Sequence, residues 1–371
     1  MFSDIFQRFI QKRPIVIMVR ILLENFLNAD KLDRWFDTVR QAQYTKEILF
    51  SSIVGLMLNV VCNVRSSVHA AYRHSEIQAS VVALYGKLQN MELTTSQGLV
   101  RYIAGEAEVL INQMGGTHPE LLPGYRVKFL DGNCIEATEH RLKVLRKTGA
   151  GALPGKALVV FDPRLGLAVD VIPCEEGHAQ ERSLLSAVAE RIQPQDVYVM
   201  DRNFCVLEFL LDFHKKSALF VARQHGNTPY NRLTDLQFIG NSATGEVFEQ
   251  DVEITTPSGE TLAIRRVVVK LNQPTRNGDH HLILLTNLDP AAADALKVAE
   301  LYLARWGIET AFQKLERHLN SEINSLGYPK AALFSFCLAL VAFNLYAVVM
   351  AALQATHADQ VIKDTVSEYY I

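Results

Sequence analysis

Three acidic residues stand in local contexts that suit metal-assisted chemistry. Asp131 follows the short apolar run 127–130, Asp201 follows the apolar run 197–200, and Glu309 lies in a segment with helical spacing. Carboxylate oxygens are ligands that hard divalent cations prefer, so acids at two strand ends and on one helix can converge on a pair of ions. Two such ions can drive in-line attack at a phosphodiester, and that is the chemistry these residue types predict.

Each acid also has a plain structural alternative. The pair Asp131-Gly132 is a common hairpin turn, although a glycine after the acid would also let a ligand approach without crowding. Asp201 precedes a helical segment and could serve as its N-cap. Glu309 could belong to a solvated helix face with ordinary ion pairs. The sequence leaves these alternatives open for each residue taken alone.

The neighbours of Glu309 make the most specific pattern. Tyr302, Arg305 and Glu309 are spaced i, i+3 and i+7, which places them on one face of a helix beside Trp306. An arginine on that face could bind phosphate oxygens as a fork. Trp306 could stack on an unpaired base, and packing in the core explains it equally well.

Composition sets broad limits. The chain has 371 residues, of which 49% are hydrophobic and 21% charged, which is ordinary for a globular protein of two or three domains. The formal net charge of −3 mildly opposes nucleic-acid binding, although an enzyme can gather positive charge on one face. The five cysteines lack metal-ligand spacing, so we expect reduced thiols in a cytoplasm, with neither a zinc site nor a disulfide framework.

Periodicity and breaking residues divide the chain into five segments. We expect a mixed α/β architecture in which a helical domain precedes a sheet with flanking helices. The expected segments are an N-terminal helical domain (1–120), a segment of strands and helices (121–228), a β-rich insertion (229–288), a helical segment (289–353) and a short tail (354–371). The tail has no terminating pattern, and both an early end of the reading frame and an ordinary frayed end fit it.

One stretch is long and apolar enough to cross a membrane. Residues 331–353 carry no charge, but they include Ser335, Asn344 and Tyr346 and follow a charged amphipathic segment. We interpret the stretch as a buried core helix. A membrane protein anchored by this segment is the alternative, and recovery of the chain in the soluble fraction would exclude an integral span.

Several segments taken together resemble the bacterial insertion-sequence DDE transposases, in the group marked by a Tyr-x2-Arg-x3-Glu-x6-Lys signature. The resemblance covers most of residues 45–353. It is carried by FSSIVGLMLNVVCNVRSSVHAAYR, LDGN, VMDRNF, LYLARWGIETAFQ and LGYPKAALFSFCLALVAFNLYAVV. Each segment alone is unspecific, and the combination is specific.

The resemblance implies a ribonuclease-H-like catalytic fold with a β-rich insertion between the second aspartate and the glutamate. Segments 121–228 and 289–353 would then be the first and second parts of one catalytic domain. The resemblance also implies that Asp131, Asp201 and Glu309 bind two Mg²⁺ ions, with Mn²⁺ as a substitute. Tyr302 and Arg305 would then contact the DNA backbone at element ends. The implied partners are double-stranded DNA and further copies of the chain in synapsis, in the cytoplasm and without a membrane.

One position departs from the signature: its lysine falls on Glu316. An inactive DNA-binding remnant that regulates transposition is therefore kept as an alternative to an active enzyme. Other polar residues are weaker candidates for DNA or metal contacts, and the sequence assigns them no role. They are Arg65, Arg73, His74, Arg141, Lys143, Arg146, Lys147, Glu175, Glu176, His178, His280 and His281.

Overall fold

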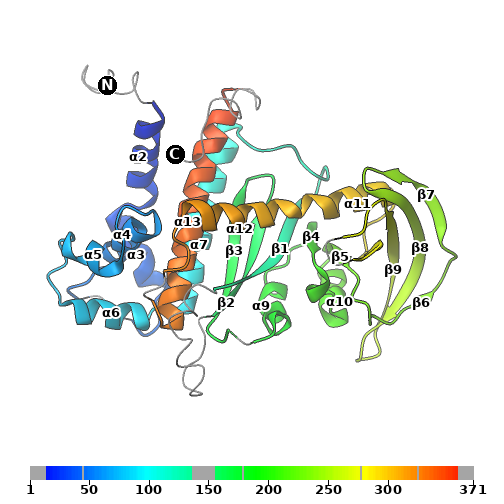
Figure 1. The fold of residues 1–371 in the computed structure, drawn as a ribbon, viewed down its shortest axis with the longest axis horizontal. Helices are drawn as coiled ribbons and strands as arrows, with labels where there is room; N and C mark the ends of the chain where they lie inside the picture. The colour runs from blue at the N-terminus through cyan, green and yellow to red at the C-terminus, as the bar shows by residue number, and fades with distance from the viewer. Residues whose placement is uncertain are drawn as a thin grey trace.

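The arrangement of the chain comes from a computed structural model (Figure 1). The structure describes residues 14–43, 46–135, 155–177, 179–275, 278–323 and 326–357. The basic run at 141–147, His178 and the tail beyond 357 lie outside these residues.

The N-terminal part is helical, as its periodicity predicts. Its helices are α2 (Pro14–Phe26), α3 (Ala29–Val39), α4 (Phe50–Val61), α5 (Val68–Arg73), α6 (Val81–Gln89) and α7 (Leu93–Met114). The spacing predicted a helix from residue 43, whereas α4 begins at Phe50. The longest of the six, α7, ends where Gly115 takes a left-handed conformation with φ of 69°, a backbone state that favours glycine.

The centre of the molecule is one mixed sheet. Its first strands are β1 (Arg126–Cys134), β2 (Lys156–Asp162), β3 (Leu167–Cys174), β4 (Asp196–Met200) and β5 (Leu219–Arg223). They lie in the order β3-β2-β1-β4-β5, with β2 antiparallel to both its neighbours and β4 parallel to β1 and β5. Three meandering strands followed by two parallel ones make the ribonuclease-H-like mixed sheet that the resemblance implied.

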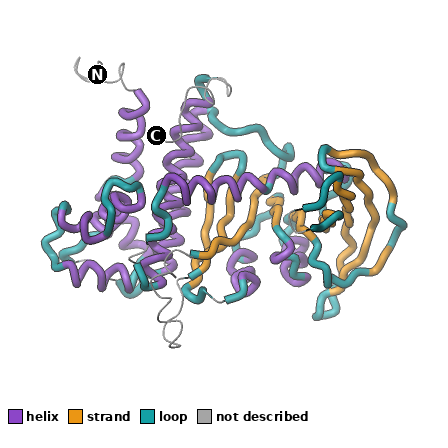
Figure 2. Tube along the Cα trace, in the orientation of Figure 1, coloured by secondary structure: helices purple, strands orange, loops and turns teal. Residues whose placement is uncertain are grey.

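Helices cover both faces of this sheet, because its strands alternate between two cores. On β4, Val197 and Val199 point to one core and Tyr198 and Met200 to the other. The first core is closed by α7 together with α11 (Ala295–Ala304), α12 (Trp306–His318) and α13 (Pro329–Gln354). The second is closed by α9 (Leu185–Ala189) and α10 (Leu207–Lys215), so the sheet is the middle of three layers (Figure 2).

The segment between β5 and α11 extends the same sheet. It holds β6 (Asn231–Arg232), β7 (Gln237–Ser242), β8 (Gly245–Thr255), β9 (Thr261–Leu271) and β10 (His281–Thr286). β10 pairs antiparallel with β5, and β9 and β8 follow in order. The bounds of β9 and β10 agree with the runs of β-branched residues that predicted them. Because these strands join the central sheet directly, the insertion has a fixed position beside β5.

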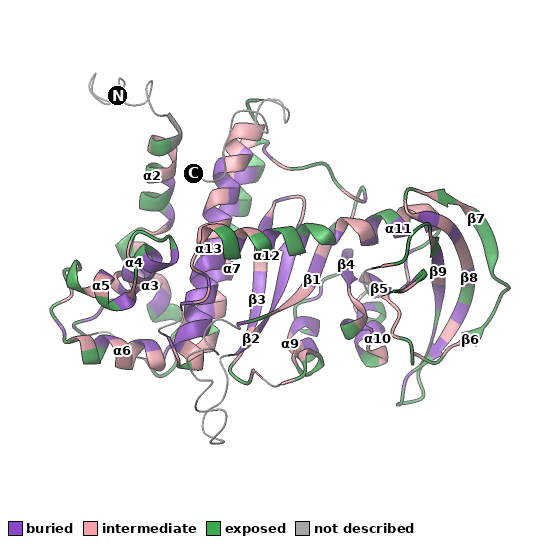
Figure 3. Cartoon of the chain, viewed as in Figure 1, coloured by how far each residue is buried: buried purple, intermediate pink, exposed green. Residues whose placement is uncertain are grey.

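The long apolar helix α13 is a core helix of this fold (Figure 3). By length and composition it would pass as a membrane span, yet 67% of its most apolar window is buried within the protein. It packs against α7, α4 and the edge strand β3. The fully buried side chain of Asn344 donates to the carbonyl of Ala168 at 2.8 Å and accepts from its amide at 2.9 Å. The side chain of Asn344 thus bonds to the backbone at the outer edge of β3, where a further strand would otherwise pair.

Candidate active site

Strand register brings the two aspartates together. The last parallel pair between β1 and β4 is Leu130 with Met200, so Asp131 and Asp201 stand one residue further on, side by side. Both positions continue the alternation that points Phe129 and Val199 towards the layer of α11 and α12. The pairing of β1 with β4 therefore places two carboxylates under the same helices.

The glutamate comes from that helical layer, which crosses the sheet (Figure 1). Helical spacing over residues 291–322 of the sequence predicts one continuous helix, but the structure divides that stretch into α11 and α12 at Arg305. There the amide of Arg305 bonds to Tyr302 and the amide of Ile308 bonds to Arg305, a tighter pattern of three residues. Arg305 keeps helical angles (φ −55°, ψ −29°). Tyr302, Arg305 and Glu309 therefore still lie on one face, as their spacing predicts.

Arg305 joins the first acid to the third. Its Nη1 donates to Asp131 Oδ2 and its Nη2 to Glu309 Oε1, both at 2.8 Å. The Arg305 side chain is only 7% exposed, against 20% for Asp131 and 47% for Glu309. Its Nε is buried and has no partner among the described residues. The guanidinium therefore occupies the space between two carboxylates as an internal cation.

Tyr302 joins the same helix to the second acid. Its hydroxyl donates to Asp201 Oδ1 at 3.2 Å, and the Arg305 guanidinium lies 5.6 Å from the centre of its ring. Burial, with the negative charge of Asp201 adding to it, raises the pKa of Tyr302 to about 12. Tyr302 is therefore a neutral donor at physiological pH, and its hydrogen bond fixes one oxygen of Asp201.

The charges at the site do not cancel fully. Burial raises the pKa of Asp131 to about 6, although Arg305 and the amide of Gly132 oppose that rise. Repulsion from Glu309 and Asp201 raises it further. Burial alone would lower the pKa of Arg305, but attraction by Asp131 and the other acids leaves it raised. The raised pKa of Asp131 therefore reflects mainly the burial of its carboxyl group, with a smaller contribution from the two neighbouring acids.

The metal site itself is not preformed. Across the described ranges, no three His, Cys, Asp or Glu side chains stand close enough to enclose one ion. The donor chemistry nevertheless fits a hard divalent cation, because all three predicted ligands are carboxylates. What keeps Asp131 and Glu309 apart is Arg305, which already holds an oxygen of each.

The structure tests the alternative structural roles that the sequence left open for each of these residues. Asp131 lies within β1 and not in a hairpin turn, and Asp201 makes no side-chain cap for the short 3-10 helix that follows it. Glu309 does form the ordinary i,i+4 pair with Arg305. Trp306 is 61% exposed, so core packing does not explain it. Gly132 faces the carboxylate of Glu181, and a Cβ there would collide with it.

Sequence reasoning missed one residue of the site, Arg223. It ends β5 as Asp201 follows β4, and its Nη1 lies 3.9 Å from Asp201 Oδ1. A charged residue directly after the apolar run 219–222 was the available signal. Of the weaker candidates, Glu175 instead pairs with Lys330 at 3.6 Å, and both His280 and His281 are exposed.

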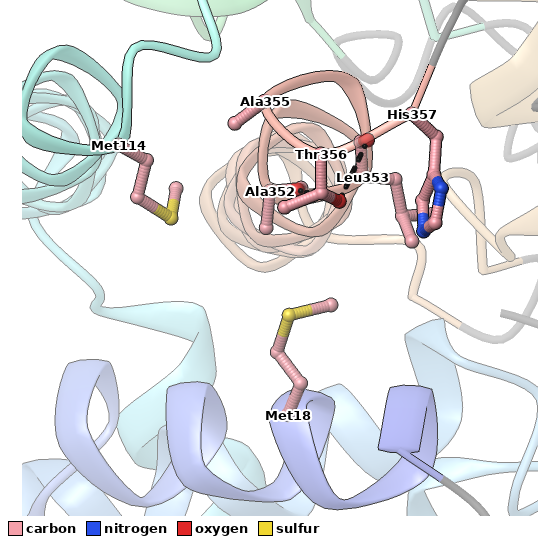
Figure 4. A pocket seen from close by; sticks show the side chains of 7 residues that line it. All are labelled: Met18, Met114, Ala352, Leu353, Ala355, Thr356 and His357. Carbon is pink, nitrogen blue, oxygen red and sulfur yellow. Dashed lines mark hydrogen bonds between the residues drawn. The ribbon is translucent and has the colours of Figure 1, made fainter.

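A hollow elsewhere on the molecule does not involve these acids (Figure 4). It lies between α2, the end of α7 and the end of α13, and has a volume of about 510 Å³. Its lining is mostly apolar and consists of Met18, Met114, Ala352, Leu353, Ala355, Thr356 and His357. Of the acids predicted to do chemistry, Asp131 lies instead on the central strand β1, Asp201 directly follows the central strand β4, and Glu309 lies on α12.

Comparison with known proteins gives the class to which this fold and site belong. Residues 122–345 match the family described as "Transposase DDE domain", and the chain belongs to that family. Members of this family generally use divalent metal ions. The matched range begins just before β1, ends within α13 and includes every acid described above.

Individual relatives are more distant. The chain is 25% identical over 166 residues to a "Probable transposase for insertion sequence element IS5377" of Geobacillus stearothermophilus. That alignment covers 44% of this chain and 41% of the relative, so the chain matches less than half of the relative's length. A solved piggyBac transposase synaptic complex with hairpin DNA aligns with 89% of this chain and 74% of its own at 9% identity, with a TM-score of 0.42.

Proposed function

We propose that the chain is a transposase that cleaves DNA at the ends of an insertion sequence and transfers the freed strand into target DNA. The observation that carries the proposal is the meeting of Asp131, Asp201 and Glu309 through Arg305 and Tyr302. Membership in the transposase DDE domain family supports it. Arg305 bonds to one acid from a strand and one from the helix, and Tyr302 on the same helix face bonds to the acid of the neighbouring strand.

In this proposal Asp131, Asp201 and Glu309 hold two Mg²⁺ ions, for which Mn²⁺ can substitute. When bound, these ions supply activation of the attacking oxygen and stabilisation of the leaving oxygen. The chain's own residues prepare the acids: Tyr302 orients Asp201 by donating to Oδ1, and Arg305 balances the charge of Asp131 and Glu309 before anything binds. DNA is itself anionic, so an acidic site without added positive charge would repel it.

Arg305 can also take part in DNA binding. A guanidinium that makes two parallel bonds to carboxylates can make the same bonds to a phosphate. A phosphate of the element end that drew Arg305 away would release one oxygen each of Asp131 and Glu309. Trp306 stands exposed at the next position, where it can stack on an unpaired base. In this way phosphate binding and exposure of the acids would occur together.

The reaction proposed has two steps at one site. Water attacks a phosphodiester at the element's end, which breaks the P–O3′ bond and leaves a 3′-hydroxyl. That hydroxyl then attacks a second phosphodiester in line, either on the opposite strand or in target DNA. The new P–O3′ bond replaces the P–O3′ bond of the attacked strand, whose 3′ oxygen leaves and takes up a proton as a hydroxyl. We propose that this takes place in the cytoplasm with at least two copies of the chain, since synapsis joins two ends. The burial of α13 in the core is consistent with a protein that needs no membrane.

Glu316 favours a second candidate, an inactive DNA-binding relative that regulates transposition. The side chain is exposed on α12, two turns beyond Glu309, where the signature has a phosphate-binding lysine. An acid there would repel the backbone that a lysine would hold. This candidate predicts binding of element ends without cleavage.

Cleavage of a labelled element end separates the two candidates. The duplex is taken from the inverted repeats that flank the coding region, and Mg²⁺ is supplied. An active transposase should cut it, and Asp131→Ala, Asp201→Ala and Glu309→Ala should each abolish cutting while end-binding is kept. Glu300→Gln, an exposed change on α11 that removes only a surface pair with Lys297, is the matched control. Cutting that survives in any of the three alanine variants removes that residue from the catalytic set.

A further inference from the structure

Arg223 stands next to Asp201 on the neighbouring strand. The last parallel pair of β4 and β5 is Met200 with Ala222, so Arg223 continues the row formed by Asp131 and Asp201. Its side chain is 17% exposed, and its Nη1 lies 3.9 Å from Asp201 Oδ1. That distance is too long for a hydrogen bond, so the two opposite charges form only a loose ion pair.

A second carboxylate holds the guanidinium at this distance. Arg223 Nη2 donates to Asp279 Oδ2 at 2.7 Å. Asp279 lies in the turn between β9 and β10, where its amide bonds to Thr275 Oγ1 at 3.1 Å and its carbonyl accepts from the Thr275 amide at 2.9 Å. The turn is therefore tied on both sides, and Asp279 is a fixed anchor for Arg223.

The position of Arg223 decides what remains free on Asp201. One oxygen, Oδ1, already accepts from Tyr302. If the guanidinium closed on Asp201 with its usual two-bond geometry, it would occupy both oxygens and compete directly with a cation. A half-buried arginine without a partner is unfavourable, so removal of the Asp279 charge would drive it onto the nearest acid. With Asp279 in place, Arg223 lowers the negative potential at the site without capturing Asp201.

We propose that Asp279 and Arg223 are positioning residues that keep Asp201 open to a divalent cation. The inference rests on the proposed function, because it takes Asp201 as a metal ligand. It gives the strands inserted between the second aspartate and the glutamate a role in the chemistry. Through the β9–β10 turn, the insertion sets the availability of an acid on β4.

Binding of Mn²⁺ to the full-length chain without DNA tests the proposal, and the electron paramagnetic resonance signal of free Mn²⁺ measures it. Asp279→Asn should weaken binding by about 10-fold, since one charge-assisted pair formed by Arg223 on Asp201 is worth about 1.4 kcal/mol or more. Arg223→Gln alone should bind at least as tightly as the wild type. The double variant Arg223→Gln/Asp279→Asn should recover wild-type affinity, because no guanidinium remains to close on Asp201.

The recovery is what separates positioning from a structural role. If Asp279 only ordered its turn, the loss would persist in the double variant, and that result would overturn the inference. Asp279→Glu should retain most of the affinity. Glu246→Gln breaks a surface pair with Lys270 on the same hairpin (3.0 Å) and should change nothing. Thermal unfolding of every variant checks that each is folded.

Asp201→Asn distinguishes a failure of the positioning role of Asp279 and Arg223 from a failure of the proposed metal site. If it abolishes Mn²⁺ binding while Asp279→Asn binds like the wild type, the inference is wrong and the proposed function stands. If Asp201→Asn leaves Mn²⁺ binding unchanged, Asp201 is not a ligand, and the inference fails together with the proposed metal site.

Discussion

Replacing Asp131 with asparagine is expected to stabilise the folded protein at neutral pH. The reason is that the fold holds this carboxyl group in surroundings that favour its protonated form. Its pKa rises from 3.8 to about 6, chiefly through burial. Asparagine has nearly the same shape and carries no charge, so it resembles the protonated acid.

The magnitude follows from the shift. A difference of about 2 pH units at about 1.4 kcal/mol per unit corresponds to about 3 kcal/mol at pH 8. Because the Asp131 side chain is 20% exposed, solvent screening reduces this figure, and we expect about 2 kcal/mol. For a chain of this length, that corresponds to a rise in Tm of roughly 3 °C.

The effect should also depend on pH in a defined direction. The folded chain binds a proton at Asp131 more tightly than the unfolded chain does, so protonation stabilises the wild type as pH falls from about 6 to about 4. The variant has no such group. Its advantage should therefore be largest at pH 8 and should vanish near pH 4.

Thermal unfolding in a metal chelator, at pH values from 4 to 8, measures this difference. Asp235→Asn, which changes an exposed acid in the insertion, is the matched control and should leave Tm unchanged. A lower Tm for Asp131→Asn than for the wild type at pH 8 would refute the reasoning. It would mean that the bond to Arg305 outweighs the burial of the charge.

Three further changes test other parts of the structure. Arg305→Lys should reduce cleavage by about 100-fold, because one ammonium cannot bridge two acids or bind a phosphate as a fork; near-normal cleavage would contradict this. Tyr302→Phe should lower the rate by about 10-fold with little change in end-binding, since only the bond that orients Asp201 is lost; a pure loss of binding would point to another role. Asn344→Leu should destabilise the protein by about 3 kcal/mol, because it leaves a buried amide and carbonyl of β3 unpaired; an unchanged Tm would show that the edge is satisfied in another way.

The parts of the site that follow from local pattern could be predicted from the sequence. Short apolar runs before Asp131 and Asp201 indicate two strands, and the spacing of Tyr302, Arg305 and Glu309 indicates one helix face. The prediction that Asp131 stands at the end of its strand is wrong, because β1 continues through pairing with β2 to Cys134. The mixed α/β fold class and the transposase family are confirmed. The metal-binding and DNA-binding roles of the individual residues stay predictions.

The remaining features depend on contacts between distant segments. Nothing in the local sequence of Arg305 shows that it would bond to Asp131, because that contact needs β1 to lie under α11 and α12. The position of Arg223 follows only from the register of β4 and β5, and its bond to Asp279 only from the pairing of β5 with β10. The division of the helix at Arg305 has only Gly307, two residues further on, as a local signal, and an isolated glycine within a helical pattern does not fix a break.

Asn344 lies on α13, so it can bond to the edge of β3 only after that later helix has been synthesised. The ribosome makes α7 and β3 before it begins α13. Until then β3 has an unpaired margin, and α7 lacks the neighbour against which it packs. Such a nascent chain would expose apolar surface and a bare strand to other copies emerging nearby. Holdase chaperones should therefore associate with this chain mainly in the interval before α13 has left the exit tunnel.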